Sequence, residues 1–347
     1  MRAQSEAVAT ATATAAAAAV AAVQGALAAL PAGRWLLAVS GGRDSMVLLD
    51  AMAGARRHEI AAVATFDHGT GAAATRACRL VERAAMMRGL PVVSGVDGAR
   101  GGATEATWRA ARWRFLNAWA DERRATVATA HTQDDQVETV VLRLLRGAGA
   151  RGLAGMRASG DAAPGAARGR QVERPLLAVP RLTVAAYARA RNVAFVEDPS
   201  NQSRAHQRNR VRLDLLPALE RAHPGFGAWC LDLSARAGAL RREVERAVDA
   251  LAPALTPDGT LVVRATAVAE FRAAEWSVLW PALAARIGVA MDRRGIARAA
   301  AWAPRAAVGA RIPLAGDAAI ERTAATFVVR RAASGTTAGS HDYILNR

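Results

Sequence analysis

The sequence predicts an α/β protein: a doubly wound parallel sheet followed by a smaller, mainly helical C-terminal domain. Three observations support this class. Short apolar runs alternate with amphipathic segments through the first half of the chain, which is the order of βαβ units in a parallel sheet. A chain of 347 residues is long enough for two domains. Apolar residues make up 52% of it, so a large core can form and global disorder is excluded.

The predicted sheet is assembled from short apolar runs, each followed by a segment with apolar residues at helical spacing. The strands are expected at Trp35–Val39, Ile60–Phe66, Pro91–Ser94 and Thr126–Ala130. The helices are expected at Ser45–Ala53, Ala73–Arg88, Glu105–Arg123 and Asp134–Leu145. Before the first strand, the Ala-rich sequence predicts a ragged start and then a surface helix near Ala16–Leu30, which Pro31 and Gly33 end.

The remainder of the chain has weaker strand signals. Gly147–Arg170 is rich in Gly, Ala and Arg and is predicted to be a mobile loop. The later elements are helices at Arg181–Arg191, Leu213–Leu219, Leu231–Ala250, Trp276–Ile287 and Gly295–Ala303, and strands at Val193–Val196 and within Ala310–Arg330. With a boundary near Pro224–Gly225, the predicted domains are residues 1–30, 31–223 and 224–334, followed by a polar tail at 335–347.

The charge balance favours a polyanionic partner. The formal net charge is +16, and all 46 basic residues are arginines because the chain contains no lysine. Mutational bias in a GC-rich genome accounts for the missing lysine, but it does not by itself create an excess of basic over acidic residues. Nucleic acid and an anionic membrane surface are the two partner classes that such a charge suits.

Cysteine usage and hydropathy favour a cytoplasmic protein. Cys78 and Cys230 lie far apart and form no CxxC pair, so neither a metal–sulfur site nor a disulfide is expected. The uncharged segment Ala7–Leu30 lacks the Leu-rich core of a signal peptide or a membrane span. We therefore expect no membrane association, and leave the oligomeric state open, with a homodimer as one option.

A Gly-rich loop follows the first predicted strand and precedes a helix. Glycines let the backbone approach a phosphate closely, and a helix N-terminus offers free amide groups. The loop is neither a Walker A sequence nor GxGxxG. It resembles the SGGxDS loop of the PP-loop ATP pyrophosphatases, which implies binding of ATP, cleavage between its α and β phosphates, and a role for Asp44 in holding Mg²⁺. A tight glycine turn with a capping serine is the structural alternative. The loop consists of Ser40, Gly41, Gly42, Arg43, Asp44 and Ser45.

A second cluster follows the fourth predicted strand and should face the same crevice. His131 can donate a hydrogen bond to a phosphate or to developing negative charge. Asp135 and Glu138 are three residues apart, so they share a helix face and could bind an amine-bearing substrate. The alternative is a helix start capped by Asp134, with the two acids in solvent.

Two groups of arginines are candidates for phosphate or RNA contacts. Arg109 and Arg112 are three apart in a predicted helix, so they could clamp a phosphate or neutralise charge that develops in a reaction. Arg208, Arg210 and Arg212 follow a polar turn, a setting that suits contacts to a nucleic-acid backbone. A solvated basic helix face explains the first group equally well, and a capped, charged helix start explains the second.

Together these motifs resemble the tRNA(Ile)-lysidine synthetase family over about residues 20–220, and Ile312–Arg331 resembles more weakly its small terminal domain. Six family motifs occur in order. They are SGGxDS (Ser40–Ser45), DHG (Asp67–Gly69), E-A-x-x-R-x-x-R-[YW] (Glu105–Trp113), A-H-x-x-D-D-Q-x-E-T (Ala130–Thr139), R-P-L-L (Arg174–Leu177) and D-x-S-N…R-N-x-x-R (Asp198–Arg212).

The resemblance implies a ligase that forms a C–N bond in two steps. ATP would adenylate the C2 carbonyl oxygen of the wobble cytidine in an isoleucine tRNA with a CAU anticodon, and lysine would then attack C2 through its ε-amine and expel AMP. It implies that Arg109, Arg112 and His131 stabilise the first step. Asp135 and Glu138 would bind lysine, and the arginines at 208, 210 and 212, with the C-terminal domain, would contact tRNA.

The chain departs from the family pattern at three places. Thr132 stands where a second histidine is common, and Trp108 replaces an alanine. Thr70 and Gly71 follow DHG where Leu-Arg is usual, which removes a basic contact. None of them is a residue to which we assign chemistry. Two other functions remain open: a PP-loop tRNA thiolase, although such enzymes commonly use paired cysteines, and a non-catalytic relative that binds tRNA or nucleotide.

Overall fold

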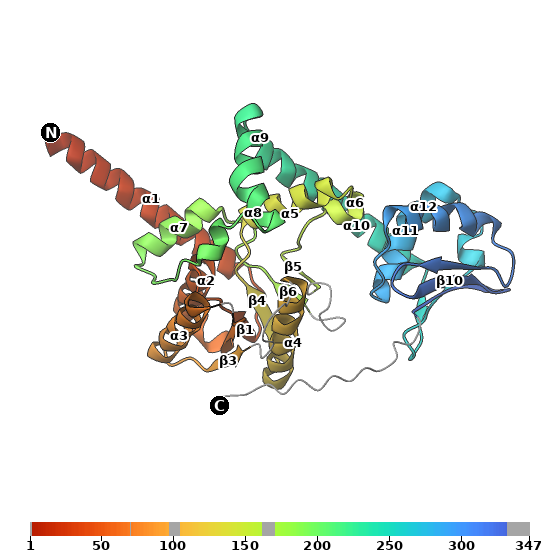
Figure 1. Ribbon diagram of the computed structural model, residues 1–347, viewed down its shortest axis with the longest axis horizontal. Coiled ribbons are helices and arrows are strands. Elements are labelled where there is room, and N and C mark those ends of the chain that lie inside the picture. The colour runs from red at the N-terminus through yellow and green to blue at the C-terminus, as the bar shows by residue number, and fades with distance from the viewer. Residues whose placement is uncertain (1, 70, 97–104, 162–170, 332–347) are drawn as a thin grey trace. The chain divides into compact units, whose positions relative to one another are not determined.

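The computed structural model describes residues 2–69, 71–96, 105–161 and 171–331 (Figure 1). Thr70 and the predicted tail lie outside the described residues. The chain divides into two compact units. The first holds the described residues up to Thr139 together with Met156–Gly227, and the second holds Val140–Gly155 and the described residues from Ala228 onward. In the part of the chain that the structure describes, no helix has the length and apolar character needed to cross a membrane.

The first unit is built on a six-stranded sheet in the order β3-β2-β1-β4-β6-β5. All neighbouring strands are parallel except β5, which pairs antiparallel with β6 at the edge. The predicted fold class is confirmed, whereas β5 and β6 were not predicted from the sequence. The strands are β1 (Trp35–Ala38), β2 (Ile60–Asp67), β3 (Val92–Val96), β4 (Thr126–Thr129), β5 (Ser159–Asp161) and β6 (Gln171–Glu173).

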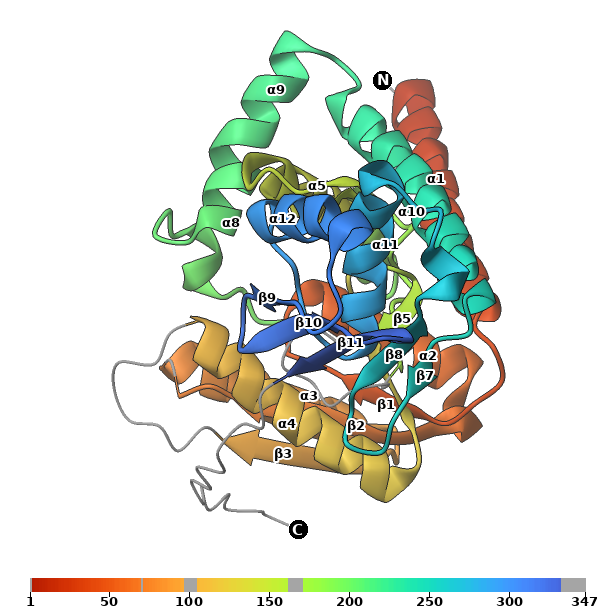
Figure 2. The same cartoon turned by 90° about the vertical axis from the view of Figure 1, so that its right-hand side faces the viewer.

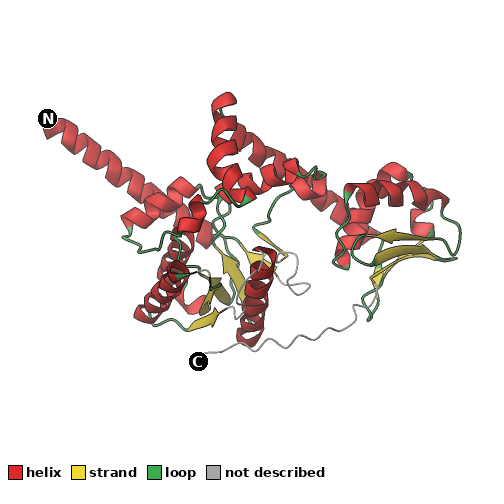
Figure 3. Cartoon of the chain, in the orientation of Figure 1, coloured by secondary structure: helices red, strands yellow, loops and turns green. Residues whose placement is uncertain are grey.

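Alternating side chains near β1 separate the two faces of this sheet. Trp35, Leu37 and Val39 belong to a buried cluster with residues of α1, α2, α3 and α7. Leu36, between them, belongs to a second cluster with residues of α4. Helices therefore cover both faces of the sheet (Figure 3). They are α1 (Arg2–Ala28), α2 (Arg43–Ala55), α3 (Ala72–Met87), α4 (Glu105–Arg123) and α7 (Arg181–Ala190).

The N-terminal helix is longer than the sequence predicted. It begins at Arg2, so the expectation of a ragged start is wrong, and alanine's high helix propensity explains the extension. Val23 and Leu27 are fully buried on its inner face. The Arg56 guanidinium binds the end of the segment, donating to the Leu27 carbonyl at 3.0 Å and to the Leu30 carbonyl at 2.7 Å.

The segment Val193–Val196 is not a strand, in contrast to the prediction. Val193 and Phe195 are partly buried and pack against the core from an irregular backbone, so the apolar run reflects packing without strand pairing. Val196 donates its amide hydrogen to the Gly41 carbonyl at 2.9 Å. The chain then forms a 3₁₀ turn (Pro199–Gln202), α8 (Gln207–Arg210), a π-helical turn (Val211–Leu215) and α9 (Leu216–Ala222).

The second unit combines helices with a five-stranded antiparallel sheet in the order β7-β8-β11-β10-β9 (Figure 2). Trp276 and Trp280 stack at 4.4 Å between ring centroids, and Phe327 packs edge-on against both. The late helices and strands were predicted, whereas β7 and β8 were not. The elements are α6 (Ala150–Leu153), α10 (Phe226–Ala250), β7 (Ala254–Leu255), β8 (Leu261–Arg264), α11 (Ala273–Arg286), α12 (Arg293–Trp302), β9 (Arg311–Leu314), β10 (Ala318–Arg322) and β11 (Thr326–Arg331).

The segment predicted as a mobile loop, Gly147–Arg170, has secondary structure in its described part. It contains α6 and the edge strand β5, while residues 162–170 lie outside the described residues. Glycine and alanine weakened the signals of both elements, because neither residue contributes to an apolar period.

Candidate active site

The loops after β1 and β4 meet at the point where the strand order reverses. These two strands are parallel neighbours. The strand β2, which follows β1 in the chain, lies on one side of the pair, and β6 and β5, which follow β4, lie on the other. Ligands of open α/β sheets bind at the carboxyl ends of strands at such a point. A cavity of about 350 Å³ lies here, between the two loops and residues of β2 and α4. Its lining includes Ser40, Asp44, His68, Arg112, His131 and Asp198.

The first loop is held in shape by Ser45. Its hydroxyl donates to the Gly42 carbonyl at 2.8 Å and accepts the Ser40 amide hydrogen at 3.1 Å. Gly42 is the N-cap residue of α2, and no side chain there accepts from the helix amides. The first amides of α2 therefore stay available to an anion at the cavity.

Gly41 occupies a position where the backbone conformation and a close neighbour exclude any side chain. Its φ of +81° lies in the left-handed region, where a Cβ atom is strained. A Cβ built on Gly41 would lie 2.7 Å from both the Cβ and the carbonyl oxygen of Ala77 in α3. The loop thus approaches α3 so closely that a side chain is excluded.

Replacing Gly41 by alanine is expected to displace the loop. The strained φ costs about 1–3 kcal/mol, and the clash with Ala77 adds to it. The melting temperature should fall, and the affinity for a non-hydrolysable ATP analogue should fall at least tenfold. Gly54→Ala is the matched control, because no atom lies within 4 Å of its added Cβ and it sits in α2. That change should stabilise the helix by up to about 1 kcal/mol. Equal behaviour of the two variants would contradict this account.

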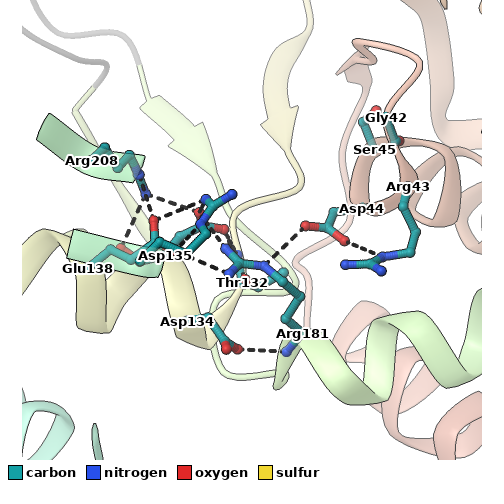
Figure 4. Close-up of polar contacts among 11 residues, drawn as sticks. Gly42, Arg43, Asp44, Ser45, Thr132, Asp134, Asp135, Glu138, Arg181 and Arg208 are labelled. Atoms are coloured by element: carbon teal, nitrogen blue, oxygen red, sulfur yellow. Dashed lines mark hydrogen bonds and ion pairs between the residues drawn. The ribbon is translucent and has the colours of Figure 1, made fainter. Parts of the chain in front are cut away.

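Asp44 is the carboxylate that the loop directs toward the cavity. Burial raises its pKa, an effect that the guanidinium groups of Arg43 and Arg181 oppose. Arg43 lies 3.3 Å away and Arg181 3.8 Å away, measured from Nε to a carboxylate oxygen (Figure 4). Among the described residues, no group of three or more His, Cys, Asp or Glu side chains could hold a metal. A cation here would take one carboxylate plus phosphate and water oxygens, which is how Mg²⁺ binds nucleotides.

The predicted arginine pair on α4 is split by the structure. Arg112 lines the cavity, and its Nε is buried without a hydrogen-bond partner among the described residues. Burial lowers the pKa of its guanidinium, and the neighbouring charge of Arg109 lowers it further. Arg109 is exposed and does not line the cavity. A buried cation of this kind favours an anionic ligand.

His131 reaches the same cavity from the loop after β4. Burial lowers its pKa to about 4, so the imidazole is neutral at neutral pH. Its Nδ1 lies 2.8 Å from the Thr129 hydroxyl. When that hydroxyl donates to Nδ1, the ring proton is on Nε2, and His131 can donate a hydrogen bond without bringing a charge into the cavity.

Behind this loop, three arginines meet two carboxylates in what we call the arginine–carboxylate cluster. Glu138 accepts from Arg208 at 2.7 Å, from Arg212 at 2.7 Å and from Arg181 at 3.1 Å. Asp135 accepts from Arg181 at 3.1 Å and from Arg208 at 3.0 Å (Figure 4). Both carboxylates lie on α5 (Gln133–Leu145), as the spacing predicted. The cluster consists of Asp135, Glu138, Arg181, Arg208 and Arg212.

The two carboxylates are ionised in this setting although they are shielded from solvent. Burial raises the pKa of each, and the arginines outweigh burial and lower both values. The Glu138 side chain is 1% exposed and that of Asp135 13% exposed. Glu138 therefore acts as the shared partner of the arginines, and Asp135 is the more accessible acid.

The predicted tRNA-contacting arginines occupy different positions. Arg208 and Arg212 point at Glu138, whereas Arg210 is exposed and donates to the Arg204 carbonyl at 3.2 Å. Asn209, between them, is buried and donates to the carbonyls of Ser200 and Ser203. The structure thus gives Arg208 and Arg212 an internal partner, and their contact with RNA stays a prediction.

Arg181 is the residue that the sequence analysis missed. It follows Pro180 at the start of α7 and belongs to no quoted motif, yet it contacts both Asp44 and Glu138. A signal for it was present, because Glu138 lies between apolar residues of a helix and a buried acid needs a cation.

Two of the three departures from the family pattern lie in the described part of the site. Thr132 is buried and donates both its amide and its hydroxyl to Asp135, at 2.8 and 2.9 Å. Trp108 is partly exposed and lies near His68, with 6.4 Å between ring centroids. Thr132 thus orients Asp135 in place of a histidine, while the structure offers no reason for tryptophan at position 108.

Comparison with known families assigns the class of this fold and site. Residues 14–219 match the family model described as PP-loop domain. The fold also resembles the solved structure of a U34-tRNA thiolase, NcsA from Methanococcus maripaludis, with a TM-score of 0.50 and 16% identity over 65% of this chain and 80% of that one. At that identity the likeness concerns the fold alone.

Curated relatives identify the family within this class. The chain is 40% identical over 257 residues to the tRNA(Ile)-lysidine synthase of Salinispora arenicola, covering 70% of this chain and 74% of the relative. It is 37% identical over 229 residues to that of Parasynechococcus marenigrum (65% and 67%), and 40% identical over 217 residues to that of Chromobacterium violaceum (60% and 48%). The chain therefore belongs to the tRNA(Ile)-lysidine synthase family, and its matches span about half to three quarters of these relatives' length.

Proposed function

We propose that this protein is a ligase that converts the wobble cytidine of a CAU-anticodon tRNA(Ile) to lysidine. In the first step the C2 carbonyl oxygen of cytidine attacks the α-phosphate of ATP, and pyrophosphate leaves. In the second step the ε-amine of lysine attacks C2, and AMP leaves with the former carbonyl oxygen. ATP is thus consumed in the first step and lysine in the second.

The observation that carries this proposal is the single cavity lined by both loops. Asp44, Arg112 and His131 come from three separate motifs of the family and meet around the same 350 Å³. A carboxylate for a metal, a buried guanidinium and a neutral imidazole suit an adenylation, in which charge develops on phosphate oxygens. We assign Asp44 to Mg²⁺, Ser40–Ser45 to the pyrophosphate, and Arg112 and His131 to the α-phosphate.

The amine site is assigned to the arginine–carboxylate cluster. Asp135 is partly exposed and ionised, so it can accept a lysine ammonium group. Glu138 is enclosed by three arginines, and we assign it to positioning rather than to contact with lysine. The exposed Arg109 and Arg210, and the net charge of +16, favour contacts with the tRNA backbone.

Incubation with ATP, Mg²⁺, labelled lysine and CAU-anticodon tRNA(Ile) tests the proposal. Label should enter the tRNA, with one AMP released for each lysine incorporated. If no tritium from labelled lysine enters the tRNA, the ligase assignment is wrong. Incorporation of labelled sulfur instead would identify a thiolase, a function that two free thiols at Cys78 and Cys230 do not favour. Binding of ATP and tRNA without turnover would identify a non-catalytic relative.

A further inference from the structure

Arg181 joins the two halves of the proposed site. Its Nε lies 3.8 Å from a carboxylate oxygen of Asp44 on the phosphate-binding loop. Its two terminal nitrogens each lie 3.1 Å from a carboxylate oxygen, one of Asp135 and one of Glu138. The side chain is 18% exposed. Figure 4 shows the guanidinium between the loop of Asp44 and the helix that carries the two acids.

The backbone of Arg181 is fixed while its side chain has several partners. Its amide donates to Asp134 at 2.7 Å, and the residue lies in the first turn of α7 after Pro180. The Cα position is thereby tied to α5. A change of partner for this guanidinium therefore requires only rotation of its side chain.

Lysine cannot bind Asp135 in this arrangement without displacing an existing partner. One Asp135 oxygen accepts from the amide and hydroxyl of Thr132, and the other faces Arg181 and Arg208. Arg208 is also held by Glu138 at 2.7 Å, whereas the contacts of Arg181 are longer, at 3.1 to 3.8 Å. Arg181 is therefore the less tightly hydrogen-bonded of the two guanidinium groups, and it is the one that also lies next to Asp44 of the Ser40–Ser45 loop.

A polyphosphate on the Ser40–Ser45 loop would offer Arg181 a stronger partner. It adds several negative charges next to Asp44, and guanidinium groups bind phosphate oxygens through paired hydrogen bonds. Movement of Arg181 toward the phosphates would remove one of the two guanidinium donors to this oxygen of Asp135 and leave that of Arg208. It would also release Asp44 toward a cation.

We propose that Arg181 couples nucleotide binding to lysine binding: phosphates on the Ser40–Ser45 loop draw its guanidinium from Asp135, which then accepts the ammonium group of lysine. This inference rests on the proposed function and assigns Arg181 as a positioning residue. It predicts that lysine binds more tightly once the nucleotide is bound, and linkage requires each ligand to strengthen the other by the same factor.

Calorimetric titration of lysine into the full chain tests the coupling, with and without Mg²⁺ and an ATP analogue that resists cleavage between the α and β phosphates. Wild-type affinity for lysine should rise at least about fivefold when the analogue is present. Arg181→Gln should bind lysine equally, within twofold, in both conditions. Arg191→Gln is the matched control at the opposite end of the same helix, because Arg191 pairs with Asp50 away from the cavity, and it should keep the full increase.

Arg181→Lys serves as a second variant in case Arg181→Gln does not fold. Lysine keeps the charge without the paired donors of guanidinium, so the increase should be smaller than in the wild type. Equal lysine affinities in the wild type with and without the analogue would overturn the coupling, as would a full increase in both Arg181 variants. A wild type that binds the analogue but never binds lysine would instead refute the lysine assignment on which the coupling rests.

Discussion

Asp44→Asn is expected to reduce tRNA-dependent AMP formation by at least about a thousandfold, which corresponds to about 4 kcal/mol in the activation barrier. Asp44 is the carboxylate that the Ser40–Ser45 loop supplies to the cavity, and no cluster of further ligands lies nearby in the described residues. Asparagine keeps the shape but removes the charge that would hold Mg²⁺ against the phosphates. AMP release measured over a range of Mg²⁺ concentrations checks the expectation, since loss of a metal ligand should shift the dependence of the rate to higher Mg²⁺ concentrations.

The same variant should fold at least as well as the wild type. Burial raises the pKa of Asp44 in the folded state, so its ionised form costs stability at neutral pH and an uncharged side chain does not. Its melting temperature should equal or exceed that of the wild type. Asp232→Asn, at an exposed ion pair with Arg236 on α10, is the control and should change neither rate nor melting. An Asp44→Asn rate within tenfold of the wild type would contradict the metal assignment.

Much of the first unit could be predicted because its signals are local. The apolar run at Trp35–Val39, the Gly-rich loop and the following helix each depend on neighbouring residues alone, and all three occur in the structure. The prediction of a strand at Val193–Val196 was wrong because it depended on a partner distant in the sequence. Val193 and Phe195 are partly buried, but the Val196 amide donates its hydrogen bond to Gly41, more than a hundred residues away in sequence.

The candidate site shows the same division between local and distant information. Helical spacing placed Asp135 and Glu138 on one face correctly. It could not reveal that Arg208 and Arg212 bind Glu138, since those partners are 70 and 74 residues away. From the sequence alone, Arg208–Arg212 is therefore predicted to contact RNA, and its partner Glu138 inside the fold is not evident. Buried carboxylates need cationic partners inside the fold, and spacing within one segment does not identify those partners.

Glu138→Gln is expected to cause the largest loss of stability among single substitutions in the arginine–carboxylate cluster. Its side chain is 1% exposed and accepts hydrogen bonds from Arg181, Arg208 and Arg212. Removal of one partner of a buried ion pair leaves uncompensated charge, and typical costs are about 3–5 kcal/mol. Denaturant-induced unfolding followed by circular dichroism measures this change. Asp214→Asn is the matched control, because its ion pair with Arg204 is exposed, and it should cost less than about 1 kcal/mol.

The pH dependence of unfolding separates this explanation from a simple packing defect. Burial raises the pKa of Glu138, but the hydrogen bond from Arg212 and the charges of Arg208 and Arg181 outweigh it, so the folded-state pKa lies below the ordinary value of 4.5. The stability that Glu138 contributes is present above pH 4.5 and is lost as the pH falls through the folded-state pKa. Wild-type stability should therefore decline over this range more steeply than that of Glu138→Gln. Parallel pH profiles, or a loss no greater than that of Asp214→Asn, would show that the arginines do not depend on Glu138 for their charge balance.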